Sequence, residues 1–315
     1  MKDLRIVFFG TPDFAVASLR ALVDNKFHVV AAVTAPDKPS GRGHKMQSPP
    51  VKTYAGEQGI PVMQPSNLKS EDFVNELRSC NADLQIVVAF RMLPEIVWNM
   101  PPLGTYNVHA SLLPDYRGAA PINWAIINGE NETGVTTFKL RHEIDTGNIL
   151  LQQRVSIADS DNAGSLHDKL MAAGAALLVQ SVEQLGLGDV KLIAQTNSKV
   201  EKHAPKIFKD DCRINWNQPA KAVRNFIRGM APFPAAFSEI SFQNGTSEAW
   251  KFFASDLNNT PSERPGVIRI EGGGILISCA DQWLEIKEVQ VPGKKRMTTY
   301  DFLKGLREIP KEVKN

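Results

Sequence analysis

The chain has 315 residues, of which 43% are hydrophobic and 22% charged, so it has the composition of a globular protein large enough for two domains. The formal net charge of +2 excludes little by itself, but no uninterrupted apolar run approaches the ~18 residues of a membrane span, and we expect no membrane segment. The three cysteines, Cys80, Cys212 and Cys279, are too scattered for a disulfide framework or a metal site. We therefore expect a cytoplasmic protein that binds no metal.

The first part of the chain alternates between strands and helices. Residues 4–9, "LRIVFF", predict a buried strand, because the apolar run breaks at Gly10-Thr11-Pro12 and is too short for a signal peptide. Thr11 is suited to cap a helix over 12–24, with Pro12 as its first residue. Residues 27–35 predict a second strand that is apolar on both sides, as strands of parallel sheets are.

The alternation continues downstream. A helix follows the prolines at 49–50, a short strand covers 60–65, and an amphipathic helix begins after Ser70. Two more strands, "ADLQIVVAF" and "GTYNVHA", precede a last large helix over 165–185. This alternation predicts an α/β domain over residues 1–189, with a doubly wound and mostly parallel sheet.

The composition changes near residue 190. Residues 190–208 are polar and lack a clear period, so we expect a linker there. In 209–315 a short helix is followed by strand-like segments that turn residues separate, which predicts a small C-terminal β-barrel of the OB-like kind. We expect Trp216, Trp250 and Trp283 to be core residues rather than stacking surfaces.

Asn107 and His109 occupy positions that indicate chemistry. They lie two apart near the end of a predicted strand, so both side chains point to the same face. Ligands of open α/β sheets bind at the carboxyl ends of the strands. Downstream, Asp145 precedes a Thr-Gly turn, and a chain that folds back there brings an amide, an imidazole and a carboxylate together.

Such a set suits the transfer of an acyl-type group to an amine. Attack on a carbonyl carbon produces an oxyanion, which an asparagine N–H and a protonated histidine both stabilise. A nearby carboxylate favours the protonated histidine, and no serine or cysteine nucleophile is required. Taken singly, however, a histidine at a strand end is usually structural, and an aspartate before Thr-Gly is usually a turn former. The residues alone leave both interpretations open.

A basic segment follows the second predicted strand. Between residues 37 and 52, four cations accompany a single acidic residue, and they are Lys38, Arg42, Lys45 and Lys52. Glycines flank Arg42, and glycine lets a backbone approach a ligand closely, so the cations could hold the phosphates of an RNA stem. The alternative is a solvated surface loop, because prolines and glycines give the segment no helix or strand period.

The segment from Asn107 to Gly147 resembles the formyltransferases that use 10-formyltetrahydrofolate. The family motif runs Asn-x-His-x-Ser-Leu-Leu-Pro, then Arg-Gly, then Asp-Thr-Gly. The matching positions are Asn107, His109, Ser111 to Pro114, Arg117-Gly118 and Asp145 to Gly147. The resemblance extends over nearly the whole chain. One departure is "AFRMLP" (89–94), which is one residue shorter than the family's Ala-Tyr-Gly-x-x-Leu-Pro and carries Arg91.

The resemblance implies roles for individual residues. The catalytic residues of the family fall on Asn107, His109 and Asp145. The segment that borders the folate site in the family falls on Ser111, Leu112, Leu113 and Pro114. In the branch of the family that formylates initiator methionyl-tRNA, a basic loop engages the tRNA acceptor arm, and its cations fall on Lys38, Arg42 and Lys45.

The resemblance therefore implies formyl transfer from 10-formyltetrahydrofolate to the α-amino group of initiator methionyl-tRNA, with no metal and no further protein partner. One alternative is a formyltransferase of the same fold that acts on a small amine, such as a nucleotide sugar or glycinamide ribonucleotide. Another is a non-catalytic tRNA-binding protein. The basic loop and the second domain argue against the first, and the complete set of Asn107, His109 and Asp145 argues against the second.

Overall fold

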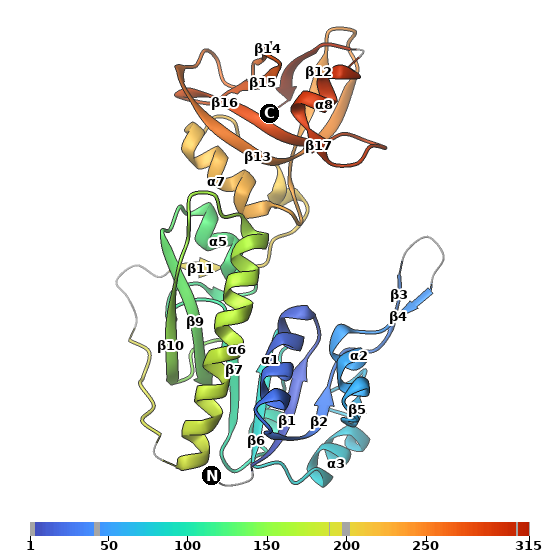
Figure 1. Cartoon of the computed structure of the whole chain (residues 1–315), viewed down its shortest axis with the longest axis vertical. Coiled ribbons are helices and arrows are strands. Elements are labelled where there is room, and N and C mark those ends of the chain that lie inside the picture. Colours follow the sequence, from blue (N-terminus) through green and yellow to red (C-terminus); the bar gives the residue numbers. More distant parts are fainter. Residues whose placement is uncertain (1–3, 41–44, 189, 197–201, 307, 315) are drawn as a thin grey trace. The chain divides into compact units, whose positions relative to one another are not determined.

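A computed structural model describes residues 4–40, 45–188, 190–196, 202–306 and 308–314 (Figure 1). The chain divides into two compact units, and each of them combines separate segments. The first unit comprises Met1–Gly118, Glu132–Ser156 and His167–His203, and the second comprises Ala119–Asn131, Ile157–Leu166 and Ala204–Asn315. The bounds of the predicted linker, 190–208, stay a prediction.

The first unit is built on a seven-stranded sheet with the order β10-β9-β7-β6-β1-β2-β5 (Figure 1). Its strands are β1 (Arg5–Gly10), β2 (His28–Val33), β5 (Val62–Met63), β6 (Leu84–Val88), β7 (Thr105–His109), β9 (Glu132–Lys139) and β10 (Ile149–Ser156). The strands from β7 to β5 run parallel, whereas β9 and β10 pair antiparallel. The prediction of a mostly parallel sheet is confirmed.

Helices cover both faces of this sheet. They are α1 (Asp13–Asp24), α2 (Pro50–Glu57), α3 (Glu71–Ser79), α4 (Glu95–Trp98) and α6 (Ala163–Leu187), the last of which enters this unit at His167. On one face, Phe73 of α3 and Val97 of α4 share a core cluster with Val87 of β6. On the other face, a Cβ on Gly174 of α6 would stand 3.2 Å from Val108 of β7 and 3.9 Å from Phe14 of α1. The sheet is therefore doubly wound, as predicted.

Helix α6 is long and apolar enough to cross a membrane, by length and composition alone. This finding differs from the sequence-based expectation, which counted uninterrupted apolar runs. Alanine, leucine, valine and methionine keep the average hydropathy of α6 high although polar residues interrupt it. In the structure 44% of its most apolar window is buried, with side chains such as Leu170, Leu178 and Val182 inside the protein. The core helix of a soluble protein passes the same test.

The second unit is an antiparallel sheet with the order β14-β15-β16-β13-β12-β18, and β17 pairs with β16. Its strands are β12 (Ala236–Phe242), β13 (Ser247–Pro261), β14 (Ile268–Glu271), β15 (Gly274–Ser278), β16 (Gln282–Gln290), β17 (Met297–Thr298) and β18 (Pro310–Lys314). The sheet curls back on itself, because the N–H of Val313 in β18 donates to the carbonyl of Gly266 just before β14, at 2.9 Å. The predicted small barrel is confirmed as a nearly closed one.

Aromatic residues fill this barrel. Trp216, Trp250 and Trp283 are all buried, as expected, and the indole N–H of Trp216 donates to the Ser238 hydroxyl at 2.8 Å.

Further short elements complete the two units. They are α5 (Pro121–Ile127), α7 (Ala220–Met230), α8 (Thr299–Lys304), the 3-10 turn Asp210–Cys212 and the short strands β8 (Arg117–Gly118) and β11 (His203–Ala204). All three cysteines are free, and burial raises the pKa of the Cys279 thiol to about 12. A thiol so reluctant to ionise is a poor nucleophile.

The basic segment contains strand structure, so the prediction of a segment with no regular structure is wrong. β3 (Lys38–Ser40) pairs antiparallel with β4 (Lys45–Gln47). Strands of three residues, one of them with Pro39, are too short to produce a period in the sequence. The carboxylate of Asp37, just before β3, accepts hydrogen bonds from Lys52 Nζ at 2.6 Å and Gln64 Nε2 at 2.8 Å, and these contacts lower its pKa. The hairpin is thus anchored at its base.

Candidate active site

Strand β7 places Asn107 and His109 on one face of the sheet. Val108 between them faces α6, so its two neighbours project from the opposite face. Asn107 is paired with Val87 of β6 on one side and with Phe138 of β9 on the other. His109 is the last residue of β7, at the carboxyl edge of the parallel strands. The predicted same-face arrangement follows from this pairing.

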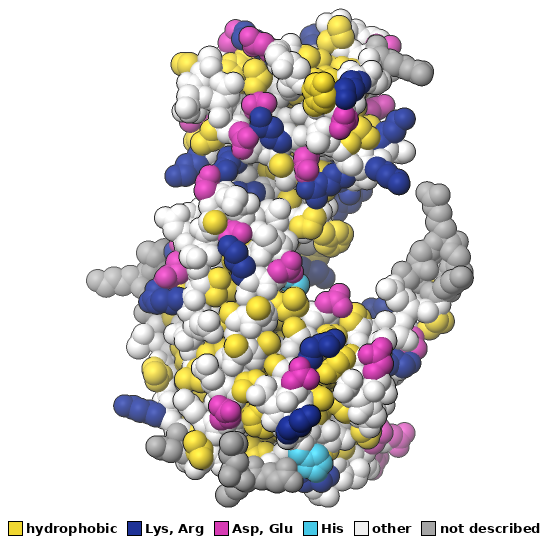
Figure 2. All heavy atoms as spheres, viewed as in Figure 1, with side chains coloured by type: hydrophobic (Ala, Val, Ile, Leu, Met, Phe, Trp, Pro, Cys, Tyr) yellow, Lys and Arg dark blue, Asp and Glu magenta, His cyan; other side chains and the backbone are white. Residues whose placement is uncertain are grey.

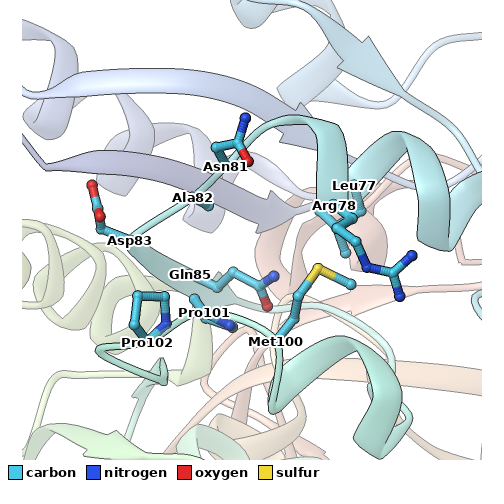
Figure 3. A pocket seen from close by; sticks show the side chains of 9 residues that line it. All are labelled: Leu77, Arg78, Asn81, Ala82, Asp83, Gln85, Met100, Pro101 and Pro102. Carbon is cyan, nitrogen blue, oxygen red and sulfur yellow. The ribbon is translucent and has the colours of Figure 1, made fainter.

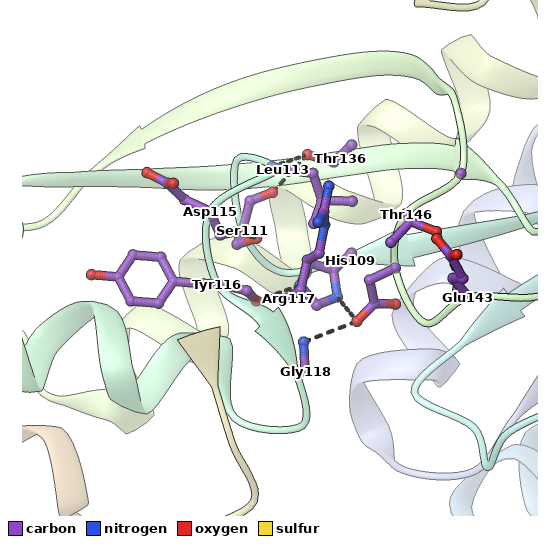
Figure 4. A network of polar contacts seen from close by, with 12 residues as sticks. His109, Ser111, Leu113, Asp115, Tyr116, Arg117, Gly118, Thr136, Glu143 and Thr146 are labelled. Atoms are coloured by element: carbon purple, nitrogen blue, oxygen red, sulfur yellow. Dashed lines mark hydrogen bonds and ion pairs between the residues drawn. The ribbon is translucent and has the colours of Figure 1, made fainter. Parts of the chain in front are cut away.

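The imidazole of His109 is held from two sides (Figure 4). Its Nε2 lies 2.9 Å from the carbonyl oxygen of Tyr116, so Nε2 carries a proton and donates it. Its Nδ1 lies 3.8 Å from Oδ2 of Asp145, which is an ion-pair distance and longer than a hydrogen bond. The ring is only 6% exposed, and its edge packs against Phe138. Nδ1 is therefore the ring nitrogen left to exchange a proton on the Asp145 side.

The Asp-Thr-Gly turn aims the carboxylate of Asp145. Asp145 adopts a left-handed backbone with φ +53°, a conformation that aspartate tolerates better than most residues. Gly147 is required, because a Cβ there would stand 1.7 Å from the carbonyl oxygen of Lys139. The Thr146 hydroxyl donates to the carbonyl of Glu143 at 3.1 Å and closes the turn. Asp145 Oδ2 also accepts a hydrogen bond from the N–H of Gly118 at 3.0 Å (Figure 4).

The Ser-Leu-Leu-Pro turn after β7 is fixed by Thr136 of β9. The Thr136 hydroxyl donates to the carbonyl of Ser111 at 2.7 Å and accepts from the N–H of Leu113 at 3.2 Å. The Ser111 hydroxyl donates to the carbonyl of Asp115 at 2.6 Å. The side chains of Ser111 and Leu113 are buried, while those of Leu112 and Pro114 are partly exposed. The turn beside His109 is therefore rigidly built, and its predicted contact with folate stays a prediction.

The structure brings His109, Asp145 and Gly118 together and leaves Asn107 on the same face as His109. Within the described residues the amide of Asn107 makes no hydrogen bond, so it remains able to bind a ligand. Sequence reasoning missed the Tyr116 carbonyl, Thr136 and Gln195. Thr136 and Gln195 act through contacts with distant parts of the chain, to Ser111 and to Asp145. Tyr116 lies only seven residues from His109, but it acts through its main-chain carbonyl, which its residue type does not reveal.

The structure describes the side chain of only one of the three predicted tRNA-binding residues, Lys38. Lys38 is exposed on β3. Arg42 and the side chain of Lys45 lie outside the described residues. Lys52, which the sequence offered as a further cation of the segment, is engaged within the chain as the partner of Asp37. Of these lysines, Lys38 is thus the one whose charge the structure shows to be exposed.

The shortened segment after β6 folds back on its neighbour. Ala89 takes a left-handed backbone with φ +46°, and the chain then presents Met92 with 72% of its surface exposed. The guanidinium of Arg91 donates to the carbonyls of Ser66, at 3.0 Å, and of Pro65. Arg91 therefore ties the segment to the loop after β5 instead of turning toward His109.

A cleft of about 310 Å³ opens at the amino edge of the sheet, beside Asp83, Gln85 and Met100 (Figure 3). Gln85, the second residue of β6, pairs with Thr105, the first residue of β7, whereas Val88 at the other end of β6 pairs with Val108 beside His109. The Thr105 hydroxyl donates to the carbonyl of Trp98 at 2.6 Å and also meets the Gln85 amide at 3.0 Å. The cleft therefore lies at the opposite end of the strands from His109.

Comparison with known families defines the class of this protein. Residues 4–182 match the family model described as "Formyl transferase", and residues 206–307 match "Formyl transferase, C-terminal domain". The first match alone covers more than half of the chain. The chain belongs to the formyl transferase family, and it is an enzyme that transfers a formyl group.

Individual relatives are more specific. The methionyl-tRNA formyltransferase of Bacteroides fragilis is 53% identical over 309 residues, which is 96% of this chain and 95% of that protein. Those of Bacteroides thetaiotaomicron and Porphyromonas gingivalis are 53% and 47% identical, and they cover 97% and 96% of this chain and the same shares of their own lengths.

Solved structures share the fold at lower identity. WlaRD, a sugar 3N-formyl transferase solved in the presence of dTDP and 5-N-formyl-THF, superimposes with a TM-score of 0.65 at 21% identity, over 94% of this chain and all of that one. HypX from Aquifex aeolicus, in complex with tetrahydrofolic acid, gives a TM-score of 0.64 at 18% identity, over 98% of this chain and 49% of that one. At these identities the likeness shows the fold alone.

Proposed function

We propose that this protein transfers the formyl group of 10-formyltetrahydrofolate to the α-amino group of initiator methionyl-tRNA, in the cytoplasm. The observation that carries the proposal is the 53% identity with methionyl-tRNA formyltransferase over 96% of the chain. Identity of this extent includes both the first unit, with His109 and Asp145, and the barrel. Relatives that share only the fold reach about 20% identity, as WlaRD does at 21%.

The groups at the carboxyl edge fit a folate co-substrate. A pteridine ring needs apolar surface and hydrogen-bonding partners at its edges. Met92 is 72% exposed and Ile144 is 58% exposed, on loops that follow β6 and β9. Their main-chain N–H groups have no acceptor within the described residues. These exposed apolar side chains and open donors support folate binding on the side of the sheet where His109 ends β7.

We assign the chemistry to Asn107, His109 and Asp145. When bound, 10-formyltetrahydrofolate would supply the formyl group: the amine of methionyl-tRNA forms a bond to the formyl carbon, the bond from that carbon to N10 breaks, and N10 takes up a proton as tetrahydrofolate leaves. The amide N–H of Asn107 and Nδ1–H of His109 are the donors for the negative charge that develops on the formyl oxygen. Asp145, 3.8 Å from Nδ1, balances the charge of the ring and is the carboxylate placed to take the proton that the amine loses. The Tyr116 carbonyl keeps the ring oriented.

The small-amine alternative draws on the sugar formyltransferase fold. That likeness, at 21% identity, carries no argument about the acceptor. Lysine and arginine side chains lie on the surface of the second unit (Figure 2), and Lys38 is exposed on the hairpin. Both observations support an acceptor with a phosphate backbone, because cations bind phosphates. The hydrogen-bonded pair of His109 and Tyr116 beside Asp145 argues against a non-catalytic binding protein.

One assay separates these functions. The protein is incubated with 10-formyltetrahydrofolate carrying a labelled formyl group, and with initiator methionyl-tRNA, a 3-amino nucleotide sugar or glycinamide ribonucleotide. We expect label on methionyl-tRNA at a kcat/KM at least 100-fold above that for either small amine. Label on a small amine in preference to tRNA would replace the proposed acceptor. Binding of tRNA without any labelled product would replace the enzyme by a binding protein.

The hairpin makes a prediction of its own. Lys38→Ala and Arg42→Ala should each weaken the affinity for methionyl-tRNA and flatten the plot of log affinity against log salt by about one unit, because one phosphate contact is lost. Lys69→Ala, which removes an exposed lysine before α3, is the matched control and should leave the slope unchanged. Filter binding between 50 mM and 200 mM salt, roughly, measures the slope. Slopes that equal the control would make the hairpin a passive loop.

A further inference from the structure

The side chain of Gln195 connects the two sequence segments that meet at Asp145. Its Oε1 accepts hydrogen bonds from Nε and Nη2 of Arg117, at 3.1 and 2.7 Å. Its Nε2 donates to the carbonyls of Asp145 and Gly147, at 2.9 and 2.7 Å. The amide therefore uses both of its donor hydrogens and both acceptor positions of its oxygen, which is its full capacity.

The chain places Gln195 there by strand-like pairing. Ile193 and Ile149 exchange both main-chain hydrogen bonds, at 2.7 and 2.8 Å, in an antiparallel bridge. Antiparallel segments run in opposite directions, so the residue two positions after Ile193 lies opposite the residue two positions before Ile149. Gln195 therefore comes opposite Gly147. The segment that looked like a featureless linker in the sequence is thus fixed against the first residue of β10.

Among the described residues, the other side-chain hydrogen bonds of the Asp145 loop are those that Arg141 and Thr146 make within the loop itself and the one between Asp145 and Gly118. Arg141 to Ile144 are exposed, and Asp145 itself adopts a left-handed backbone. The carboxylate of Asp145 meets Gly118, the residue next to Arg117 in the chain. Gln195 therefore restrains Asp145 in two ways. It donates directly to the main-chain carbonyl of Asp145, and it holds Arg117, whose neighbour Gly118 donates to the carboxylate of Asp145.

We infer that Gln195 is a positioning residue for formyl transfer, which holds the carboxylate of Asp145 against Nδ1 of His109. The inference rests on the proposed function, because it concerns the same site. Gln195 itself touches neither His109 nor the carboxylate of Asp145 in the described structure, so it acts through the 145–147 segment and through Arg117.

Two variants divide the role of Gln195. In Q195A all four hydrogen bonds are lost, and we expect kcat to fall about 10-fold, since two bonds hold the 145–147 segment and each contributes modestly. In Q195E the carboxylate still accepts from Arg117 but opposes the carbonyls of Asp145 and Gly147, so kcat should fall at least as far. The KM for methionyl-tRNA should change less than 3-fold in both. Gln153→Ala, an exposed glutamine of β10 with no side-chain hydrogen bond in the described structure, is the control and should match wild type.

A double-variant cycle with Asp145→Asn tests the path of the effect. If Gln195 acts through the carboxylate of Asp145, Q195A should lower the residual single-turnover rate of D145N less than 2-fold. An equal loss in both backgrounds would overturn the inference, and so would a Q195A variant that matches Q153A. A rise in KM at constant kcat would make Gln195 a substrate contact instead.

A second measurement does not depend on the acceptor. Hydrogen exchange of the main chain over 141–148 should be faster in Q195A and Q195E than in Q153A, at unchanged global melting temperature. If wild type transfers no formyl group to methionyl-tRNA, the proposed function fails while this result still decides whether Gln195 orders the loop. Unchanged exchange over 141–148 would overturn the inference even in an active enzyme.

Discussion

Replacing His109 by alanine is expected to lower kcat for the formylation of methionyl-tRNA by about 100- to 1,000-fold, the usual cost of losing one preorganised donor to a developing oxyanion. The ring is 6% exposed and fixed by the Tyr116 carbonyl, so it reaches the transition state with little reorganisation. The loss should appear in kcat more than in KM, because the charge that the ring stabilises exists only in the transition state. Quenched-flow measurement of labelled product gives kcat directly.

His109→Gln separates the position of the side chain from its charge. A glutamine amide can still donate to the Tyr116 carbonyl, but it cannot carry a proton on the Asp145 side as an imidazole can. We expect H109Q to lose nearly as much activity as H109A while its melting temperature stays closer to wild type. Near-normal turnover of H109A would show that the histidine is only a structural residue at the end of β7.

Local patterns in the sequence predicted the frame of this site. The spacing of Asn107 and His109 placed both on one face, because side chains alternate along a strand. Strand and helix periods predicted the doubly wound sheet, and turn residues predicted the barrel. The expectation that the three tryptophans are core residues was also correct, although Trp216 lies in a turn and outside the strands that hold Trp250 and Trp283. Each of these conclusions depends on residues that are close together in the chain.

Contacts between distant segments could not be predicted in the same way. The distance of 3.8 Å between His109 and Asp145 depends on a loop that folds back over the sheet. The residues alone offered this only as one of two open interpretations, and the family resemblance favoured it. Thr136 fixes the Ser-Leu-Leu-Pro turn from a neighbouring strand, and Gln195 reaches the site from a segment with no period. The hairpin β3–β4 was missed because its strands are too short to show a pattern.

The division into units was also hidden in the sequence. Residues 119–131 and 157–166 precede position 189, where a simple two-part division would end the first domain, yet they cluster with the barrel. For example, the side-chain amide of Asn123 donates to the carbonyl of Gly229 at the end of α7, 2.8 Å away. Arg224 of α7 forms a two-pronged pair with Asp159, which lowers the pKa of that carboxyl. Long-range pairs of this kind leave no trace in composition.

Asp145 is expected to be at least as sensitive as His109. Asp145→Ala removes the negative charge beside Nδ1, the acceptor for the Gly118 N–H and the carboxylate assigned to the proton of the amine. Asp145→Asn keeps the shape and an oxygen that can accept from Gly118, so it removes the charge alone. We expect both to lower kcat by about 100- to 1,000-fold or more, with D145N little better than D145A, since the two lost functions both depend on the charge.

The double variant H109A/D145A shows whether the two residues act as one unit. Catalytic groups that work together are strongly non-additive, so the double variant should lie within about 10-fold of the slower single variant instead of showing the product of both losses. Asp168→Asn, which neutralises an exposed carboxylate on α6, is the control and should retain wild-type kcat. D145N with more than a tenth of wild-type kcat would mean that the carboxylate serves through its shape. Losses that multiply in the double variant would mean that His109 and Asp145 act at separate steps, and the 3.8 Å pair would then have no catalytic meaning.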